Sequence, residues 1–191
     1  KLSYGRNRPT GEVHPSDVPT GNDLLLGNQL VVNGSSHSKF MRCIAVYLTI
    51  RAPRYWLQEF DTYKIGTVAL SGSTMHTIMK RLLTKDDFSG DINPAHLDWL
   101  NMQIVQKNFV TVKANLPEGF MQTRGIFLNY QVLKTMYEQR RSHRLQEWQD
   151  FCDWVRDNIP FSFLITGEEP SICVGANTED ELREFYKYMK S

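Results

Sequence analysis

The chain has 191 residues, of which 41% are hydrophobic and 12% aromatic, which is enough for one well-packed domain with a short appendage. Its formal charge of +1 gives no electrostatic argument for a nucleic-acid-binding protein. No apolar run of about 18 residues predicts a membrane-spanning helix. The opening residues KLSYGRNRPTG lack an apolar signal core, and the three cysteines form no CxxC pair. We therefore expect a soluble cytoplasmic protein with free thiols that binds neither membranes nor nucleic acids.

The N-terminal part predicts an irregular arm followed by a helix. Residues 1–21 include three prolines and three glycines and show little periodicity, so we expect no regular element there. Asn22 and Asp23 can cap a helix that continues to about Val32. The Asn-Gly pair that follows would end this helix.

A strand and three helices are expected next. Residues 43–51 are β-branched and aromatic, which predicts a largely buried strand. A proline opens the expected helix at 53–63, and the Ser/Thr/Gly-rich residues 66–73 would break it. Another helix is predicted at 76–83, and a short capped one at 84–87.

The second half of the chain predicts mainly helices. A proline opens a long amphipathic helix at 94–115, and residues 123–128 indicate a strand or an extended lead-in. Helices follow at 129–141 and 144–158, so the chain has mixed α+β character with helix in the majority. The apolar side of the long helix consists of Leu97, Leu100, Ile104 and Val105. The remaining expected elements are a short strand at 171–174 and a charged helix at 178–190.

Several common catalytic signatures are absent from the sequence. It contains no GxGxxG, GxxxxGK[ST], HExxH or GxSxG motif. The histidines show no metal-ligand spacing with carboxylates or cysteines, so no metal site is expected. These five histidines are His14, His37, His76, His96 and His143.

The segment 51–76 is the first place to look for a functional site. It mixes charged and hydroxyl residues with large aromatic rings instead of sorting them onto opposite faces of a helix. Polar groups held among rings are costly unless something binds them, although rings at helical spacing are also typical of a core. The polar residues are Arg54, Glu59, Asp61, Thr62 and Lys64, and the rings are Tyr55, Trp56, Phe60 and Tyr63.

A second candidate segment, 129–148, holds three arginines and a histidine within five residues. Arginine forks bind phosphate or carboxylate, but a solvated helix junction that Glu147 partly neutralises would have the same composition. Asn129 either caps the following helix or meets the edge of a bound ring. His37, in the serine-rich loop 35–38, is either a surface histidine or a ligand contact. The cationic residues of the segment are Arg140, Arg141, His143 and Arg144.

Five motifs occur in an order that resembles one family. Residues 34–43 read GSSHSKFMRC, 62–67 read TYKIGT, and 70–76 read LSGSTMH. KANLP at 113–117 precedes a helix that begins at Asn129 and continues to Arg140, His143 and Glu147. This order is similar to that of the flavin-dependent thymidylate synthases over roughly residues 22–160. Their pattern has a GHxSxxEH loop, an RHRxxS helix, an ExSxRY turn and an Arg-x-x-Leu-Pro segment.

The chain departs from that family at several motif positions. The RHR triplet is replaced by the residues 62–64, TYK, so one cation remains there. Cys43 stands for the second histidine of the first loop and Glu59 for a glutamine, and the turn's arginine is replaced near Thr74 or Met75. The pattern WxxEFDTYKxGT…STMH resembles a divergent branch of the family that is common in phages and gut Firmicutes.

The resemblance implies a helix-rich single α+β domain with a small antiparallel sheet. It divides the chain into an arm at 1–21, the domain at 22–166, and a strand-and-helix extension at 167–191. It also implies a homotetramer with active sites shared between subunits, and FAD as the cofactor. The reaction would be one-carbon transfer to C5 of a pyrimidine deoxynucleotide such as dUMP, with NADPH and methylenetetrahydrofolate as further reactants.

The resemblance also implies roles for residues of this chain. Those expected at the nucleotide are Ser71, Ser73, Lys113 and Arg140. Those expected at the flavin are His37, Thr62, Tyr63, Lys64, Thr67, Asn129 and His143. The candidate catalytic residues are Glu59, Tyr63 and His76. Two alternatives stay open: a nucleotide-binding homologue without flavin catalysis, and a structural protein that binds partners through its arm and C-terminal helix.

Overall fold

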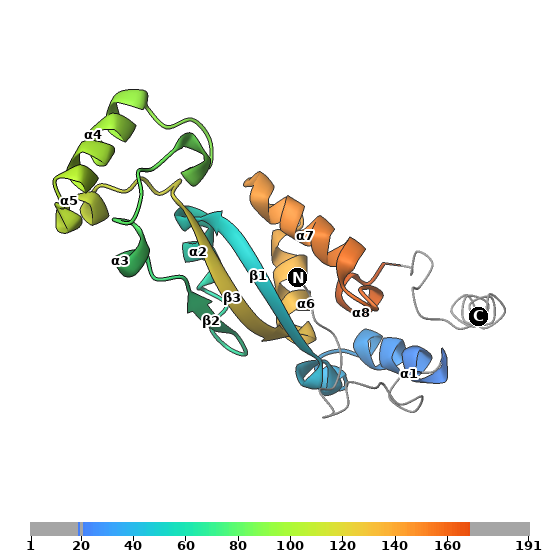
Figure 1. Ribbon diagram of the computed structural model, residues 1–191. Coiled ribbons are helices and arrows are strands. Elements are labelled where there is room, and N and C mark those ends of the chain that lie inside the picture. The colour runs from blue at the N-terminus through green and yellow to red at the C-terminus, as the bar shows by residue number, and fades with distance from the viewer. Residues whose placement is uncertain (1–18, 20, 169–191) are drawn as a thin grey trace. The chain divides into compact units, whose positions relative to one another are not determined.

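The computed structural model describes residue 19 and residues 21–168, except for the side chains of residues 75 and 76 (Figure 1). The chain divides into two compact units. Residues 47–127 form one, which we call the sheet unit, and the described residues up to 46 and from 128 onward form the other, the helical unit. Outside the described residues lie most of the expected arm at 1–21, the strand at 171–174 and the helix at 178–190.

The sheet has three antiparallel strands in the order β1-β3-β2 (Figure 1). Its strands are β1 (Ala45–Pro53), β2 (Val68–Ser71) and β3 (Met121–Asn129). β2 and β3 pair in a register that runs from Val68 opposite Phe127 to Ser71 opposite Arg124. The prediction of a helix-rich fold with a small antiparallel sheet is confirmed.

Two predictions about strands are wrong. The strand at 43–51 is not largely buried, because exposed Tyr47 and Thr49 alternate with buried Val46 and Leu48. The sequence also predicts a break at 66–73, where the structure has β2. All four side chains of β2 are exposed, so backbone pairing with β3 rather than an apolar pattern makes it a strand.

The helix α2 (Arg54–Phe60) follows β1 directly. Trp56 and Phe60 are buried, with ring centroids 5.3 Å apart, so these two rings of the candidate segment belong to the core. The helix ends three residues before the predicted position. It ends because Thr62 donates both its N–H, at 3.1 Å, and its hydroxyl, at 2.7 Å, to the Glu59 carbonyl and closes a turn there.

The other helices of the sheet unit pack around one apolar cluster. They are α3 (Thr74–Thr77), the 3₁₀-helix η3 (Lys85–Asp87), α4 (Pro94–Val105) and α5 (Phe109–Ala114). Thr84 and Asp87 form a capping box at η3, as predicted for 84–87. The expected helix at 76–83 is wrong, because α3 ends at Thr77 and the residues that follow turn into the cluster. The buried members of the cluster are Ile78, Leu83, Phe88, Leu100, Ile104, Val112, Leu116 and Phe120.

The expected single helix at 94–115 is divided into α4 and α5, which lie side by side (Figure 1). α4 ends in a Schellman motif, in which the Asn108 N–H donates to the Gln103 carbonyl and the Lys107 N–H to the Ile104 carbonyl, each at 3.0 Å. Lys107 has a left-handed φ of 60°. Glycine usually occupies this position, so a lysine there hides the end of the helix from sequence patterns. Val105, predicted on the apolar side, is 70% exposed.

The helical unit is built around the helix α6 (Tyr130–Arg140). α6 packs against the 3₁₀-helix η2 (Ser38–Cys43), against α7 (Gln146–Asn158) and against α8 (Phe163–Thr166) (Figure 1). The predicted helices at 129–141 and 144–158 are confirmed within two residues, and α1 (Gly21–Val32) confirms the predicted N-terminal helix. α8 is one short turn that the sequence analysis missed.

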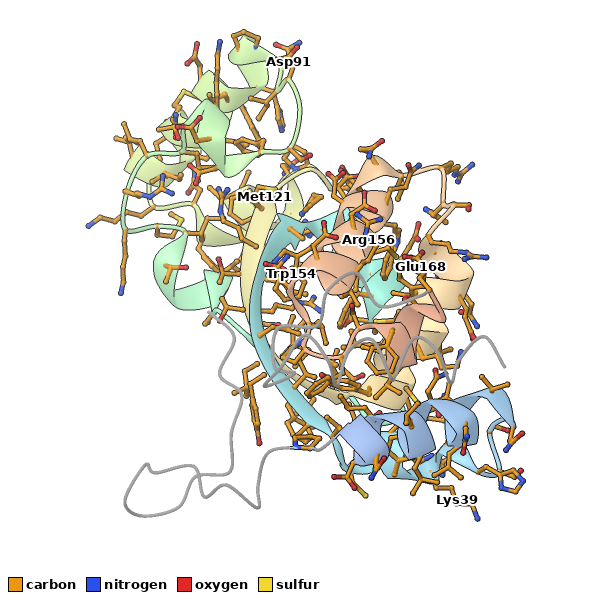
Figure 2. All side chains as sticks on the ribbon, turned by 90° about the vertical axis from the view of Figure 1, so that its right-hand side faces the viewer. Lys39, Asp91, Met121, Trp154, Arg156 and Glu168 are labelled. Carbon is orange, nitrogen blue, oxygen red and sulfur yellow. The ribbon has the colours of Figure 1, made fainter. Side chains whose placement is uncertain are left out.

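Residues near the end of the described chain are tied to α6 in the helical unit. The Tyr137 hydroxyl donates to Oε1 of Glu168 at 2.7 Å. Burial, together with this bond, raises the pKa of Tyr137 to about 12. Figure 2 labels Glu168 together with Trp154 and Arg156 of α7. None of the helices in residues 21–168 has the length and apolar character needed to cross a membrane.

Candidate functional site

The expected site segment contains a loop at residues 61–67, which we call the signature loop. The loop begins with the Tyr63 N–H donating to the carbonyl of the last residue of α2 at 3.0 Å. Near its end, the Thr67 N–H approaches the Lys64 carbonyl at 3.5 Å. Gly66 has a φ of 81°, the conformation that the third position of a type II turn requires and that glycine adopts without strain. Two successive turns therefore give the loop a defined shape.

The predicted site residues in and beside this loop differ in their surroundings. Thr62 and Lys64 are exposed, whereas Glu59 and Tyr63 are half-buried. The Thr62 hydroxyl already serves as a donor to the Glu59 carbonyl. The hydroxyl oxygen of Thr67 is buried and has no hydrogen-bond partner among the described residues. A buried hydroxyl without a partner lowers stability by about 1–3 kcal/mol. Thr67 is therefore the loop residue at which a bound polar atom would be most favourable.

Sequence reasoning missed Arg124, the basic partner of the signature loop. Its Nη1 donates to Oδ1 of Asp61 at 2.6 Å, and its side chain is 13% exposed. The sequence pattern could have revealed it, because Arg124 shares one face of β3 with the buried Ile126 and Leu128. A charged residue on a buried strand face is unusual enough to mark a site.

Lys113 and the turn that follows β2 lie together in the sheet unit. The Lys113 ammonium donates to the hydroxyl of Thr74. Ser73, the neighbouring residue, is exposed and occupies the N-cap position of α3, and Ser71 is exposed at the end of β2. The structure thus brings the Lys113 ammonium to the hydroxyl of Thr74, the residue that follows Ser73. The side chain of His76 lies outside the described residues, so its role stays a prediction.

The helical unit contains a second group of predicted residues, which we call the Trp148 cluster: Arg140, His143 and Trp148. The guanidinium carbon of Arg140 lies 4.9 Å from the centroid of the Trp148 ring, and the His143 ring meets that ring edge-on at 6.4 Å. Trp148 itself is 0% exposed. A guanidinium stacked on an indole engages it through its face, while its N–H donors lie in its own plane. This contact keeps the Arg140 guanidinium beside the buried Trp148 ring.

A hydrogen bond also determines the protonation pattern of His143. The Leu145 N–H donates to Nδ1 of His143 at 3.2 Å, so this nitrogen is an acceptor. In the neutral imidazole the proton then lies on Nε2. The Gln149 side chain donates to the His143 carbonyl at 2.7 Å and fixes the backbone of the same residue. Nε2 is therefore the donor nitrogen of the neutral His143 ring.

The remaining predicted residues of the helical unit lie at the other end of α6. The Asn129 side chain accepts a bond from the Val132 N–H at 3.1 Å, so it caps α6. His37 is exposed before η2, and its neighbour Ser38 donates to the Gln131 side chain at 3.4 Å. Asn129 and Arg140 are 11 residues apart along a helix, which separates them by about 16 Å. The structure therefore does not bring these two predicted residues together.

The predicted site residues are divided between the two units. Within the described residues, no three histidine, cysteine or acidic side chains are grouped to hold a metal ion. The sheet unit carries Glu59, Thr62, Tyr63, Lys64, Thr67, Ser71, Ser73, the backbone of His76, and Lys113. The helical unit carries His37, Asn129, Arg140 and His143.

Two solved structures are similar to this chain. One is the flavin-dependent thymidylate synthase ThyX from Helicobacter pylori complexed with FAD and dUMP, with a TM-score of 0.65 and 17% identity. The other is Thymidylate Synthase X from the same organism with FAD and dUMP, with a TM-score of 0.65 and 18% identity. Each match covers 77% of this chain and 82% of the other. No protein-family profile and no curated protein sequence matches the chain. The described chain thus has the fold of the flavin-dependent thymidylate synthases.

Proposed function

We propose that this protein is a flavin-dependent enzyme of the thymidylate synthase type, which transfers a one-carbon unit to C5 of a pyrimidine deoxynucleotide such as dUMP. The observation that carries the proposal is the contact of Lys113 with Thr74, beside the exposed hydroxyls of Ser71 and Ser73. A cation among hydroxyl donors is suited to a nucleotide phosphate. The fold is shared with an enzyme that was solved with FAD and dUMP.

Arg140 is the second residue that we assign to the nucleotide. Its guanidinium is held against the buried Trp148 ring, so little conformational entropy is lost when it binds an anion. Lys113 provides a point charge, whereas Arg140 provides a planar fork that suits phosphate oxygens. Each of the two side chains is suited to bind phosphate oxygens.

The residues of the signature loop fit the polar parts of a flavin. The Thr67 hydroxyl lacks a partner among the described residues, and Lys64 adds a positive charge for a diphosphate. We assign His37, Thr62, Tyr63, Asn129 and His143 to the same cofactor. When bound, FAD would supply hydride chemistry, with NADPH and methylenetetrahydrofolate as the further reactants. Glu59, Tyr63 and His76 are the residues we assign to holding and moving protons at the pyrimidine ring.

Three further proposals follow from the same assignment. The protein would be a homotetramer whose sites are shared between subunits. It would act in the cytoplasm, and its replaced RHR triplet would place it in the divergent phage and gut Firmicutes branch of the family. Size-exclusion chromatography with light scattering tests the first of these, and a clean monomer would contradict it.

Flavin binding is the first test of the proposed function. We expect the purified protein to be yellow, or to bind added FAD with a change in flavin fluorescence. We also expect dUMP to raise the melting temperature, since a ligand at 100 times its Kd stabilises a protein by about 2.7 kcal/mol. Arg140→Ala should remove most of the dUMP shift. Protein that is colourless and binds no added FAD would contradict the flavin mechanism.

A second candidate function is nucleotide binding without flavin catalysis. One observation favours it: in the triplet Thr62-Tyr63-Lys64 the single cation, Lys64, is exposed. Each lost charge-assisted bond weakens binding by about 1.5–3 kcal/mol. The loss of two cations would therefore lower the affinity for the diphosphate of FAD most. A protein that is stabilised by dUMP but not by FAD would support this alternative.

A further inference from the structure

The signature loop is connected to β3 at both of its ends. At its start, Asp61 accepts a 2.6 Å bond from Arg124, and at its end the chain enters β2 at Val68, which pairs with Phe127. Arg124 and Phe127 are three residues apart on one strand, a distance of about 10 Å. The loop that carries Thr62, Tyr63, Lys64 and Thr67 is therefore closed on a single strand.

The burial of this ion pair indicates that its effect is on geometry more than on stability. The Arg124 side chain is 13% exposed and that of Asp61 48%. Nε of Arg124 is buried and has no hydrogen-bond partner among the described residues. Desolvation of a guanidinium and an unpaired N–H both oppose the attraction between the charges. Replacing both members of such a pair with apolar side chains often leaves stability unchanged. Removing Arg124 alone should also cost little, because the Asp61 carboxylate that stays behind is 48% exposed and remains solvated.

We propose that Arg124 is a positioning residue that holds the signature loop in its binding conformation. The consequence for the flavin rests on the proposed function, whereas the anchoring of the loop does not. With Arg124 in place, the segment between Asp61 and Val68 has two fixed ends. Without it, the start of the loop would lose its ion pair with β3 but keep the turns that end α2. The side chains of Tyr63 and Lys64 would then sample more orientations, and binding would have to order them.

A second ion pair in the same unit provides a matched control. Nη2 of Arg54 lies 3.3 Å from Oε1 of Glu118, and the Arg54 side chain is 29% exposed. Arg54 also donates to the Leu116 carbonyl at 3.2 Å. This arginine is therefore half-buried and ion-paired like Arg124, but its partner belongs to a segment other than the signature loop. Arg54→Met and Arg124→Met remove the same charge from one sheet unit.

The experiment measures loop protection and flavin affinity in the full chain. Hydrogen–deuterium exchange reports on the N–H groups of Thr62, Tyr63 and Thr67, and fluorescence titration gives the Kd for FAD. We expect Arg124→Met to increase exchange at these three amides and to raise the Kd about tenfold. Its melting temperature should stay close to that of the wild type. Arg54→Met should change neither loop exchange nor the Kd, and Arg124→Lys should recover part of the loss.

The outcomes separate the anchoring proposal from the proposed function. If the wild type binds no FAD but Arg124→Met still increases loop exchange, the flavin function fails and the anchoring is supported. If Arg124→Met leaves loop exchange unchanged, the anchoring proposal is wrong, whatever happens to the flavin. Asp61→Asn, at the more exposed partner, provides the same test should Arg124→Met not fold.

Discussion

The signature loop and the Trp148 cluster both present cations beside aromatic rings, but they hold these cations by different means. In the Trp148 cluster, Arg140 rests on a ring that is 0% exposed, so its orientation depends on core packing. In the signature loop, Lys64 is exposed, and the loop's start is held by an ion pair between Asp61 and Arg124. One region is therefore preorganised by apolar burial and the other by a charge pair.

Because the two regions are held differently, substitutions in them should have different effects on stability and on binding. Removal of the buried Trp148 ring should lower the stability of the helical unit. A change in the signature loop should alter binding while leaving the unfolding free energy almost unchanged. The four predictions that follow test this contrast.

The largest expected effect is on Trp148. Trp148→Ala removes a fully buried ring from α7 and should lower the free energy of unfolding by about 3–5 kcal/mol. Lys64→Ala, at an exposed position of the loop, should change it by less than about 0.5 kcal/mol. Urea unfolding followed by circular dichroism measures both values. If both substitutions lowered the free energy of unfolding by the same amount, the two regions would not be held by different means.

The next effect concerns nucleotide affinity. Lys113→Ala should weaken dUMP binding by about tenfold to a hundredfold, because a charge-assisted bond contributes roughly 1.5–3 kcal/mol. Isothermal titration calorimetry gives the Kd. Lys85→Ala removes an exposed lysine elsewhere in the same unit and should leave the Kd unchanged. If Lys113→Ala binds dUMP as the wild type does, the phosphate is held by other residues.

A smaller effect, dependent on pH, is expected at Asp87. Bonds from the Arg81 side chain and from the Thr84 N–H hold the pKa of Asp87 below its ordinary value. The ionised carboxylate therefore stabilises the folded state above about pH 4, and this contribution disappears as the pH falls through the lowered pKa. Asp87→Asn should cost about 1 kcal/mol at pH 7.

The loss of unfolding free energy caused by Asp87→Asn should depend on pH. The difference between wild type and Asp87→Asn should shrink as the pH falls below about 4 in acid-unfolding measurements. The loss in Trp148→Ala arises from packing and should keep its size over the same range. A constant difference for Asp87→Asn would mean that the carboxylate charge contributes nothing there.

The smallest expected effect is a difference in reactivity between the thiols of Cys43 and Cys152. Burial raises the pKa of Cys152 to about 11, whereas Cys43 is exposed. At pH 8 iodoacetamide should therefore modify Cys43 and spare Cys152 in the folded protein, as peptide mass mapping would show. Cys152 lies one helical turn after Trp148 on α7, so Trp148→Ala should make it reactive. Rapid labelling of Cys152 in the wild type would indicate that this core opens readily.

Strong local signals predicted much of the fold. The helices at 129–141 and 144–158 were predictable because apolar periodicity, an asparagine cap and a following proline agreed. β2 was missed because its exposed side chains give no pattern and its pairing with β3 is a long-range property. The division at Lys107 was missed because a lysine took the left-handed position of a glycine.

The candidate site was predictable to a similar extent. The resemblance assigned Lys113 and the serines of the turn after β2 to one ligand, and the structure has Lys113 in contact with Thr74 of that turn. The ring beneath Arg140 and the ion pair of Arg124 with Asp61 did not, because each joins residues through tertiary packing. Asn129 illustrates a different limit: its type and position suit both a cap and a ligand contact, and the structure shows that its side-chain oxygen caps α6.

The left-handed Lys107 also offers a practical route to a better experimental background. A side chain in that conformation carries a steric cost of about 1 kcal/mol, which glycine does not have. Lys107→Gly would therefore raise the melting temperature of the protein, through a change at a residue to which no binding role is assigned. Built into such a background, damaging changes such as Trp148→Ala would remain folded at temperatures where their ligand binding can be measured.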